Sequence, residues 1–341
     1  MPKLPPAVII LQAYYQATEQ RLIRIIQQQE ARGNVTAYRR RILAQVNAEM
    51  RGLDKFAADW LRGEVPAAYG KSAAAVYAYI GESIPVSLVT RSTPAIGTII
   101  ENALGEMTDA HNFVGRIMND ELRRAGIEAT AMKLSTGDTI KQMQKNMLAN
   151  LTDRGITAIR DKNGREIRLD TYASMIARTT VREATNLGTL NEMAELGNDL
   201  VQMTNHSSAC PLCGPLEGRV YSISGNDKRY PPLSAAFGRG FRTIHPNCGH
   251  SVTPYIEDFD DDATTTRAFS RRPINQDPRS KAEIESYQRV QSAKAAKRAD
   301  MKQWNKYRAV TPDGTPKNLA TFRRWKQENG PKWQELQGKY R

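Results

Sequence analysis

The sequences Cys210-Pro-Leu-Cys213 and His245-Pro-Asn-Cys-Gly-His250 are separated by residues 214–244, and together they hold every cysteine of this 341-residue chain. Two ligands that are two residues apart can bend around one ion. Two such pairs form a tetrahedral site whose sulfur and imidazole donors suit Zn²⁺. We therefore predict a structural zinc site that joins two distant segments. Cys210 and Cys213 form one pair, and Cys248 with His245 or His250 forms the other.

The spacing leaves several alternatives open at this stage. His245 gives the two-residue spacing to Cys248, but the pattern does not choose between the two histidines, and His206 is a weaker candidate. Three reduced cysteines packed as small apolar side chains are the plain structural alternative. A disulfide framework is not expected, because three cysteines are few and odd in number for this length.

A catalytic metal is not favoured, because such a site needs an open coordination position and a nearby acid or base. The zinc-deaminase pattern requires glutamate two residues after a histidine, but Ser208 stands two residues after His206. It also requires proline before the cysteine pair, where this chain has Ala209. We therefore expect a chain that is not an enzyme.

The first 150 residues carry apolar side chains at helical spacing. Pro66 is expected to open a new helix, because proline suits the first helical position. The predicted helices start near Pro6, Thr36, Pro66, Ile96 and Ile140.

The pattern changes at Gly155. Short β-like runs, Ile156–Arg160 and Glu166–Leu169, flank Asp161-Lys-Asn-Gly164, and Asn-Gly is a strong signal for a hairpin turn. A helix is expected after Asp170 or Thr171. Strands are predicted at Leu200–Thr204 and Arg219–Ile223, on either side of the first cysteine pair.

The acidic run 257–262 marks a shift in composition, and we interpret it as a solvated domain edge. Beyond it we predict a helix from Lys281 to about Arg308, a turn over 311–316 and a short amphipathic end. The predicted fold class is α+β, predominantly α. It consists of a helical domain (1–152), an α+β zinc-binding domain with a β-hairpin (153–256), and an acidic linker followed by a basic helical tail (257–341).

Net positive charge is concentrated in the tail. Residues 263–341 hold 19 basic and 7 acidic side chains, whereas the first 262 residues hold 30 and 29. A localised positive segment favours a polyanion or an acidic protein surface as partner. Trp304, Trp325 and Trp333 lie among these basic residues, and we expect them either to stack on nucleic acid or to pack on protein.

No membrane segment or secretory signal is predicted. The longest early apolar run, Ala7–Leu11, is far shorter than the ~20 residues that span a bilayer. We expect a soluble protein that stays in the cytoplasm or in something assembled there.

Several of these features follow one another along the chain in a fixed order. In this order of features the chain resembles the phage minor capsid protein 2 family. It is similar, more distantly, to Mu F-like head morphogenesis proteins. The resemblance is most specific over 155–256, and Gly249 stands where the family usually has arginine. The features that carry it are the hairpin 155–169, the helix Tyr172–Ala184, the pair His206–Cys213, the strand Leu216–Ile223 and the segment Thr243–Pro254.

The resemblance implies a virion protein of a tailed phage, present in few copies at the portal or inner head surface. Its expected partners are the portal or major capsid protein, with possible non-specific DNA contact through the basic tail. We also expect the protein to form an oligomer around the portal and to be present in the host cytoplasm during assembly. The alternative is a zinc-containing nuclease or a DNA-binding protein that acts on phage or host DNA.

Overall fold

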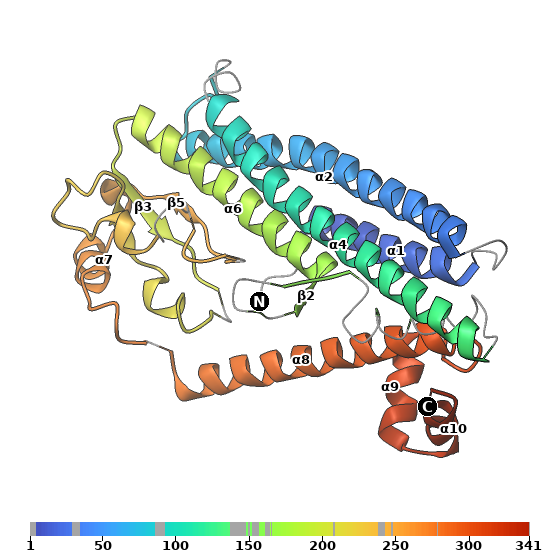
Figure 1. The fold of residues 1–341 in the computed structure, drawn as a ribbon. Helices are drawn as coiled ribbons and strands as arrows, with labels where there is room; N and C mark the ends of the chain where they lie inside the picture. The colour runs from blue at the N-terminus through green and yellow to red at the C-terminus, as the bar shows by residue number, and fades with distance from the viewer. Residues whose placement is uncertain are drawn as a thin grey trace. The chain divides into compact units, whose positions relative to one another are not determined.

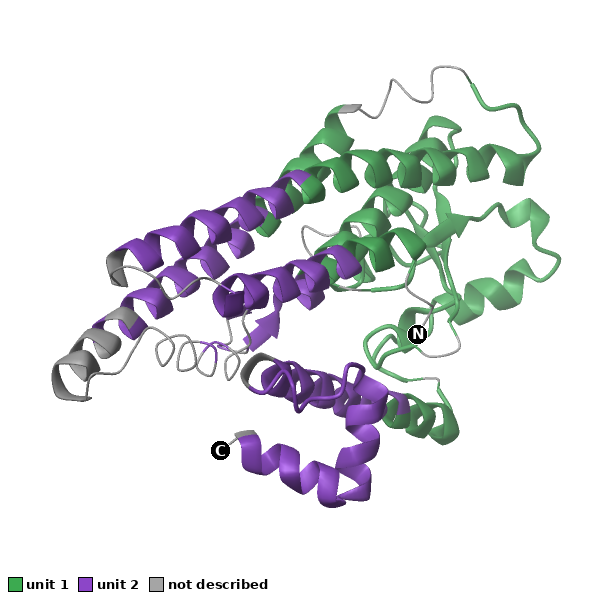
Figure 2. Ribbon diagram, turned by 90° about the vertical axis from the view of Figure 1, so that its right-hand side faces the viewer, with its two compact units in different colours: residues 1–11, 56–107, 173–289 green, residues 12–55, 108–172, 290–341 purple. Residues whose placement is uncertain are grey.

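The computed structural model describes residues 5–28, 35–85, 93–136, 148, 151, 157–160, 164, 166–206, 209–237, 243–246, 248–277 and 279–340 (Figure 1). Two compact units are present, each made of three separate segments (Figure 2). Unit 1 comprises Met1–Leu11, Phe56–Met107 and Ala173–Arg289, and unit 2 comprises Gln12–Lys55, Thr108–Tyr172 and Val290–Arg341. The linear division into three domains stays a prediction.

The described residues form mainly helices, with two small antiparallel sheets, which confirms the predicted α+β and predominantly α class. The helices are α1 (Pro6–Gln28), α2 (Val35–Ile80), α4 (Thr93–Thr136), α6 (Leu169–Glu195), α7 (Ala263–Ser270), α8 (Lys281–Val310), α9 (Leu319–Glu328) and α10 (Pro331–Tyr340). The strands are β1 (Ala158–Arg160), β2 (Glu166–Arg168), β3 (Leu200–Met203), β4 (Val220–Ser222) and β5 (Val252–Pro254). Short 3₁₀ turns are η1 (Gly214–Leu216), η2 (Leu233–Ala235) and η3 (Glu257–Phe259).

Unit 1 contains a three-stranded sheet in the order β4-β3-β5, with both neighbours antiparallel to β3. The predicted strands over 200–204 and 219–223 are confirmed, whereas β5 was not predicted. One apolar cluster joins the sheet to two helices, because Val76 of α2 and Met193 of α6 pack with Val201, Tyr221 and Val252. This face of the sheet lies on the side where α6 runs past it (Figure 1). The other face is also buried, in a second cluster of Leu200, Val220, Tyr230 and Tyr255.

Close approach of α2 to α6 depends on a glycine. At Gly188 of α6, a Cβ atom would clash with Ser72 Oγ and lie 2.6 Å from the Tyr69 carbonyl oxygen. The same contact region includes a hydrogen bond of 2.5 Å from the Ser72 hydroxyl to the Thr185 carbonyl oxygen. Only a residue without a side chain allows this packing of α6 on α2.

Unit 2 contains the predicted hairpin, in which β1 pairs antiparallel with β2 and Ile159 lies opposite Ile167. Gly164 has φ +75°, which suits the predicted turn, while Asp161–Asn163 and Arg165 lie outside the described residues. The end of the hairpin is tied to α1, because Arg168 forms ion pairs with Glu19 (2.6 Å) and Asp170 (3.0 Å). The helix predicted over 140–151 lies almost wholly outside the described residues.

The prediction of a helix that begins at Pro66 is wrong, because α2 runs without a break from Val35 to Ile80. Leu61, Val65 and Tyr69 are all buried and recur every four residues across the proline, so one face stays in the core. An internal proline costs roughly 3 kcal/mol through its lost hydrogen bond and ring clash. Burial of the continuous apolar face on both sides offsets this cost.

The three tryptophans of the tail, which the sequence predicts either to stack on nucleic acid or to pack on protein, belong to a small apolar core in the tail. Trp333 is buried with Tyr307 and Phe322, and Trp304 and Trp325 pack against this cluster. The indole N–H of Trp304 donates to the Pro316 carbonyl oxygen at 2.8 Å. The tryptophans thus pack within the tail itself.

The acidic run before α7 is not a string of solvated carboxylates. Glu257 pairs with Arg229 and Arg267, and Asp260 accepts the Tyr255 hydroxyl at 2.8 Å. These ion pairs and this hydrogen bond join Glu257 and Asp260 to the rest of unit 1, so the interpretation of a solvated linker does not describe these two carboxylates. Asp258, Asp261 and Asp262 of the run are exposed.

Candidate metal centre

Sheet topology brings the two predicted ligand segments together. The segment with Cys210 and Cys213 leaves the carboxyl end of β3, and the segment with His245, Cys248 and His250 leads into the amino end of β5. Because β3 and β5 are antiparallel, with Met203 opposite Val252, these ends lie side by side. The first pair is shaped by a turn in which the amide N–H groups of Cys213 and Gly214 both donate to the Cys210 carbonyl oxygen.

All five predicted donors meet, in two groups that share Cys213. In the first group, the Cys210 and Cys213 sulfurs are 3.3 Å apart, and His245 Nε2 lies 3.3 and 3.1 Å from them. In the second group, Cys248 Sγ lies 3.7 Å from Cys213 Sγ and 3.5 Å from His250 Nδ1. Donors that share a tetrahedral zinc ion at ~2.0–2.3 Å lie roughly 3.3–3.8 Å apart, so most of the separations within each group suit donors to one ion. The five donor atoms taken together do not all lie within 4.8 Å of one another.

Both histidines are held through the ring nitrogen that faces away from the sulfurs. His245 Nδ1 lies 2.7 Å from the Pro246 carbonyl oxygen, and His250 Nε2 lies 2.6 Å from Glu217 Oε1. An acceptor on the far nitrogen is the usual arrangement of a metal-binding histidine, because it fixes the tautomer and the ring. The geometry therefore orients both His245 and His250 as donors.

Glu217 orients His250, a role that the sequence did not predict, although Glu217 lies only four residues after Cys213. Besides holding His250, Glu217 Oε1 accepts the backbone N–H of His206 at 2.7 Å. The His206 ring lies 3.1 Å from the Gly249 carbonyl oxygen and packs edge-on against His250, with ring centroids 4.3 Å apart. His206 is thus a neighbour of the two donor groups and belongs to neither.

The electrostatics of the cluster show how closely the thiols interact. A hydrogen bond with Cys213 lowers the pKa of Cys210 to about 4 and that of Cys248 to about 3. The pKa of Cys213 is raised, because its proton is shared with the sulfurs on both sides. Hydrogen bonding to Cys210 raises the pKa of His245 to about 9. Two thiolates therefore share the proton of Cys213, and a divalent metal ion that bound all three sulfurs would displace that proton.

The fourth histidine lies elsewhere, in unit 2, and is a core residue. His111 is 1% exposed, with Nδ1 2.6 Å from Asp54 and Nε2 2.8 Å from the Tyr15 hydroxyl. Burial raises the pKa of Tyr15, which keeps the phenol protonated. The trio therefore joins α1, α2 and α4 by hydrogen bonds and does not present an activated nucleophile.

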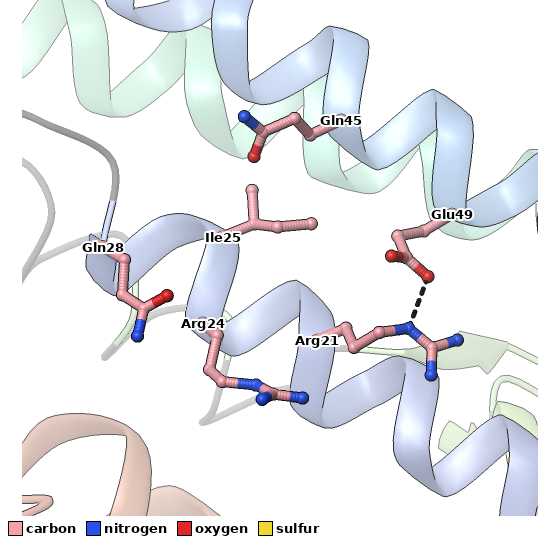
Figure 3. Close-up of a pocket in the computed structure, with 6 residues that line it drawn as sticks. All are labelled: Arg21, Arg24, Ile25, Gln28, Gln45 and Glu49. Atoms are coloured by element: carbon pink, nitrogen blue, oxygen red, sulfur yellow. Dashed lines mark hydrogen bonds and ion pairs between the residues drawn. The ribbon is translucent and has the colours of Figure 1, made fainter.

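A groove of about 420 Å³ opens in unit 2 between α1 and α2, and its charge is largely paired (Figure 3). The guanidinium of Arg21 points toward Glu49 and forms an ion pair of 2.8 Å. Arg24 lies beside it and is exposed. The residues that line the groove are Arg21, Arg24, Ile25, Gln28, Gln45 and Glu49.

Comparison with known proteins gives the family. The model of the family described as "Phage minor capsid protein 2" matches residues 11–303, and the chain belongs to this family. Part of the chain is similar to a structural protein of Lactococcus phage LL-H, with 26% identity over 141 residues. That alignment covers 38% of each protein, so the chain spans well under half of this relative's length. No solved structure matches the chain.

None of the described helices combines the length and the apolar character needed to cross a bilayer.

Proposed function

We propose that this protein is a low-copy structural component of a tailed-phage head, located at the portal or the inner head surface and bound to capsid proteins. Family membership over residues 11–303 is the observation that carries this proposal. The distribution of charge supports this proposal. Residues 1–262 are nearly neutral and residues 263–341 are basic, which suits a protein located between the capsid shell and packaged DNA.

We further propose that the cluster of three cysteines and two histidines binds zinc in a structural role. The two groups together offer three thiols and two imidazoles, enough donors to fill the four positions of a structural zinc ion. The ion would fasten the end of β3 to the start of β5, and so close a loop of about 35 residues by metal ligation. A structural rather than catalytic role of the ion would agree with the proposal that this protein is not an enzyme.

The test of the head location is quantitative mass spectrometry of gradient-purified particles from the source phage. We expect a few to tens of copies per particle, in a fixed ratio to the portal protein. Absence from mature particles would overturn the proposal. In that case metal-dependent nicking of plasmid DNA, abolished by His245→Ala, would establish the nuclease alternative.

The test of the metal site is the zinc content of the purified chain and of two variants. Cys213→Ser removes the donor that both groups share and is expected to lose zinc and the melting transition of unit 1. His206→Gln is the matched control, because His206 belongs to neither group, and it should keep the metal. Full zinc content in Cys213→Ser would contradict the assignment.

Contact with packaged DNA is proposed for α8. Its amino-terminal two-thirds is mostly exposed, and Arg289, Lys297 and Arg298 are exposed basic residues on it. We expect their joint replacement by glutamine to lower the salt dependence of duplex binding by up to about three counterions, at ~0.9 per phosphate contact. Fluorescence anisotropy with a labelled duplex measures this.

The matched control for the DNA experiment replaces three exposed basic residues of α2, namely Arg51, Arg62 and Lys71, by glutamine. This variant removes the same charge from the near-neutral body and should leave the salt dependence almost unchanged. Equal effects of the two triple variants would show that net charge, rather than α8, governs binding.

A further inference from the structure

One arginine of the tail lies on the turn that carries the first cysteine pair. Arg279 precedes α8, and its guanidinium donates from Nη1 to the Ala209 carbonyl oxygen at 2.6 Å. A Cβ atom on Gly214 would lie 3.0 Å from both Cδ and Nε of this side chain. Arg279 therefore contacts both ends of the segment 209–214, the cysteine turn. Only 8% of the arginine side chain is exposed.

The guanidinium is held in this position by groups of the tail. Asp277 accepts from Nε of Arg279 at 2.9 Å and from Nη2 at 2.5 Å. This two-point ion pair fixes the plane of the guanidinium, while Nη1 bonds to Ala209. The guanidinium also lies over the ring of Tyr287 in α8, 5.9 Å from the ring centroid. Arg279 thus links the cysteine turn to the first part of α8, and all of these residues belong to unit 1.

The helix begins directly after this arginine. Ser280 and Glu283 form a capping box, in which the Ser280 hydroxyl accepts the Glu283 N–H at 3.3 Å and Glu283 Oε2 accepts the Ser280 N–H at 2.7 Å. Residues 274–277, just before Arg279, are all exposed. Because the cap orders the backbone from Ser280 into the helix, the contact of Arg279 sets where α8 starts on unit 1.

The proposed metal would act on the same turn. Cys210 and Cys213 are its two donors, and an ion bound to both sulfurs would hold the turn in the shape that Arg279 contacts. From this shared turn we infer that zinc binding and the docking of α8 on unit 1 are coupled through Arg279. The inference rests on the proposed metal site and adds a regulatory role, in which loss of the ion releases the start of the basic helix. Arg279 is a positioning residue and does not bind the ion.

Thermodynamic linkage makes this coupling measurable from two sides. If zinc stabilises the docked arginine by some factor, the docked arginine must raise the affinity for zinc by the same factor. Hydrogen exchange of the full chain, with zinc and after chelation, measures the first factor at the start of α8. We expect zinc to slow the exchange of the amides of residues 284–290 at least about fivefold, the lower end of the usual coupling between two sites.

Competition with a chromophoric chelator measures the second factor. Arg279→Ala should bind zinc more weakly by the same factor, and its α8 amides should exchange equally fast with and without the metal. Arg271→Ala is the matched control, because Arg271 is an exposed arginine of the same connection, and it should keep the native values of both. If Arg279→Ala speeds exchange in α8 but leaves zinc affinity unchanged, its role is merely structural and the coupling is overturned.

A second pair of variants perturbs the contact from the cysteine turn. Gly214→Ala places a Cβ atom 3.0 Å from the Arg279 side chain and should displace it, which weakens zinc binding severalfold. The same substitution in the Arg279→Ala chain should have no further effect, because the side chain that it displaces is gone. Equal weakening in both backgrounds would show that the two positions act independently and would contradict coupling through Arg279.

The outcomes distinguish the two proposals. A native chain that binds no zinc would refute the metal site and the coupling with it. A native chain that binds zinc, with α8 amides that exchange at the same rate after chelation, would refute only the coupling. If Arg279→Ala does not fold, Asp277→Asn takes its place, because it keeps the arginine and weakens the ion pair that holds it. This variant should show part of both effects, and native values of both would overturn the inference.

Discussion

Replacement of Gly188 by alanine should destabilise unit 1, although alanine is the better helix former. The new Cβ would clash with Ser72 Oγ and lie 2.6 Å from the Tyr69 carbonyl oxygen. The hydroxyl of Ser72 can rotate, but the carbonyl belongs to the backbone of α2 and moves only with the helix. The helix α6 would therefore have to shift away from α2 by several tenths of an ångström.

The magnitude follows from two opposing effects. Alanine in place of glycine stabilises a helix interior by about 1 kcal/mol. Extra volume in a well-packed contact costs about 1–3 kcal/mol, and more where the backbone must move. We expect a net loss of about 1–2 kcal/mol in the free energy of unfolding. A loss of 1 kcal/mol corresponds to about 2–4 °C in the melting temperature of a unit of roughly 180 residues.

Urea unfolding, followed by far-UV circular dichroism and tryptophan fluorescence, measures this loss. Gly70→Ala is the matched control, because Gly70 also lies in a helix and a Cβ there would meet nothing within 4 Å. That control should gain stability by up to about 1 kcal/mol. A Gly188→Ala chain as stable as the control would refute the close contact of α6 with α2.

Two further perturbations test buried polar groups. His111→Gln should lower the free energy of unfolding by about 1–3 kcal/mol, because Asp54 and Tyr15 lose their partner. Burial lowers the pKa of His111 below its usual 6.5, so the unfolded chain takes up the proton first. The native chain should therefore lose stability as the pH falls below about 6.5, and urea unfolding at several pH values should show that this part is absent from the variant. Arg219→Met keeps the aliphatic stem but removes donors to three carbonyl oxygens at the end of α7, beginning with Ser270. We expect a loss of about 1–3 kcal/mol and faster amide exchange in α7, and unchanged exchange there would contradict this role.

The local sequence was sufficient for much of the fold. The hairpin, β3, β4 and the long helix α8 follow from turn residues, alternation and helical periodicity, which act over a few neighbours. The sequence also predicted five candidate donors, and the structure brings them together in two groups that could hold a metal ion. The pairing of the two ligand segments could be proposed from the chemistry of zinc alone.

Other features depend on contacts that have no local signal. Pro66 looks like the start of a helix, and only burial on both sides of it keeps α2 continuous. The tryptophans among the tail's basic residues could have faced nucleic acid, and α9 and α10 instead fold them into a core. In both cases the free energy of burying apolar surface outweighs the local preference.

The sequence alone determined the set of candidate metal donors, the helical character of the chain and the concentration of net positive charge in its tail. Only the tertiary structure decided which groups surround those donors. Glu217 reaches His250 because β4 and β5 both pair with β3, and Asn186 of α6 accepts the backbone N–H of Val252 in β5. Such neighbours come from distant parts of the chain, and their arrangement is set by sheet pairing and helix packing rather than by spacing along the sequence.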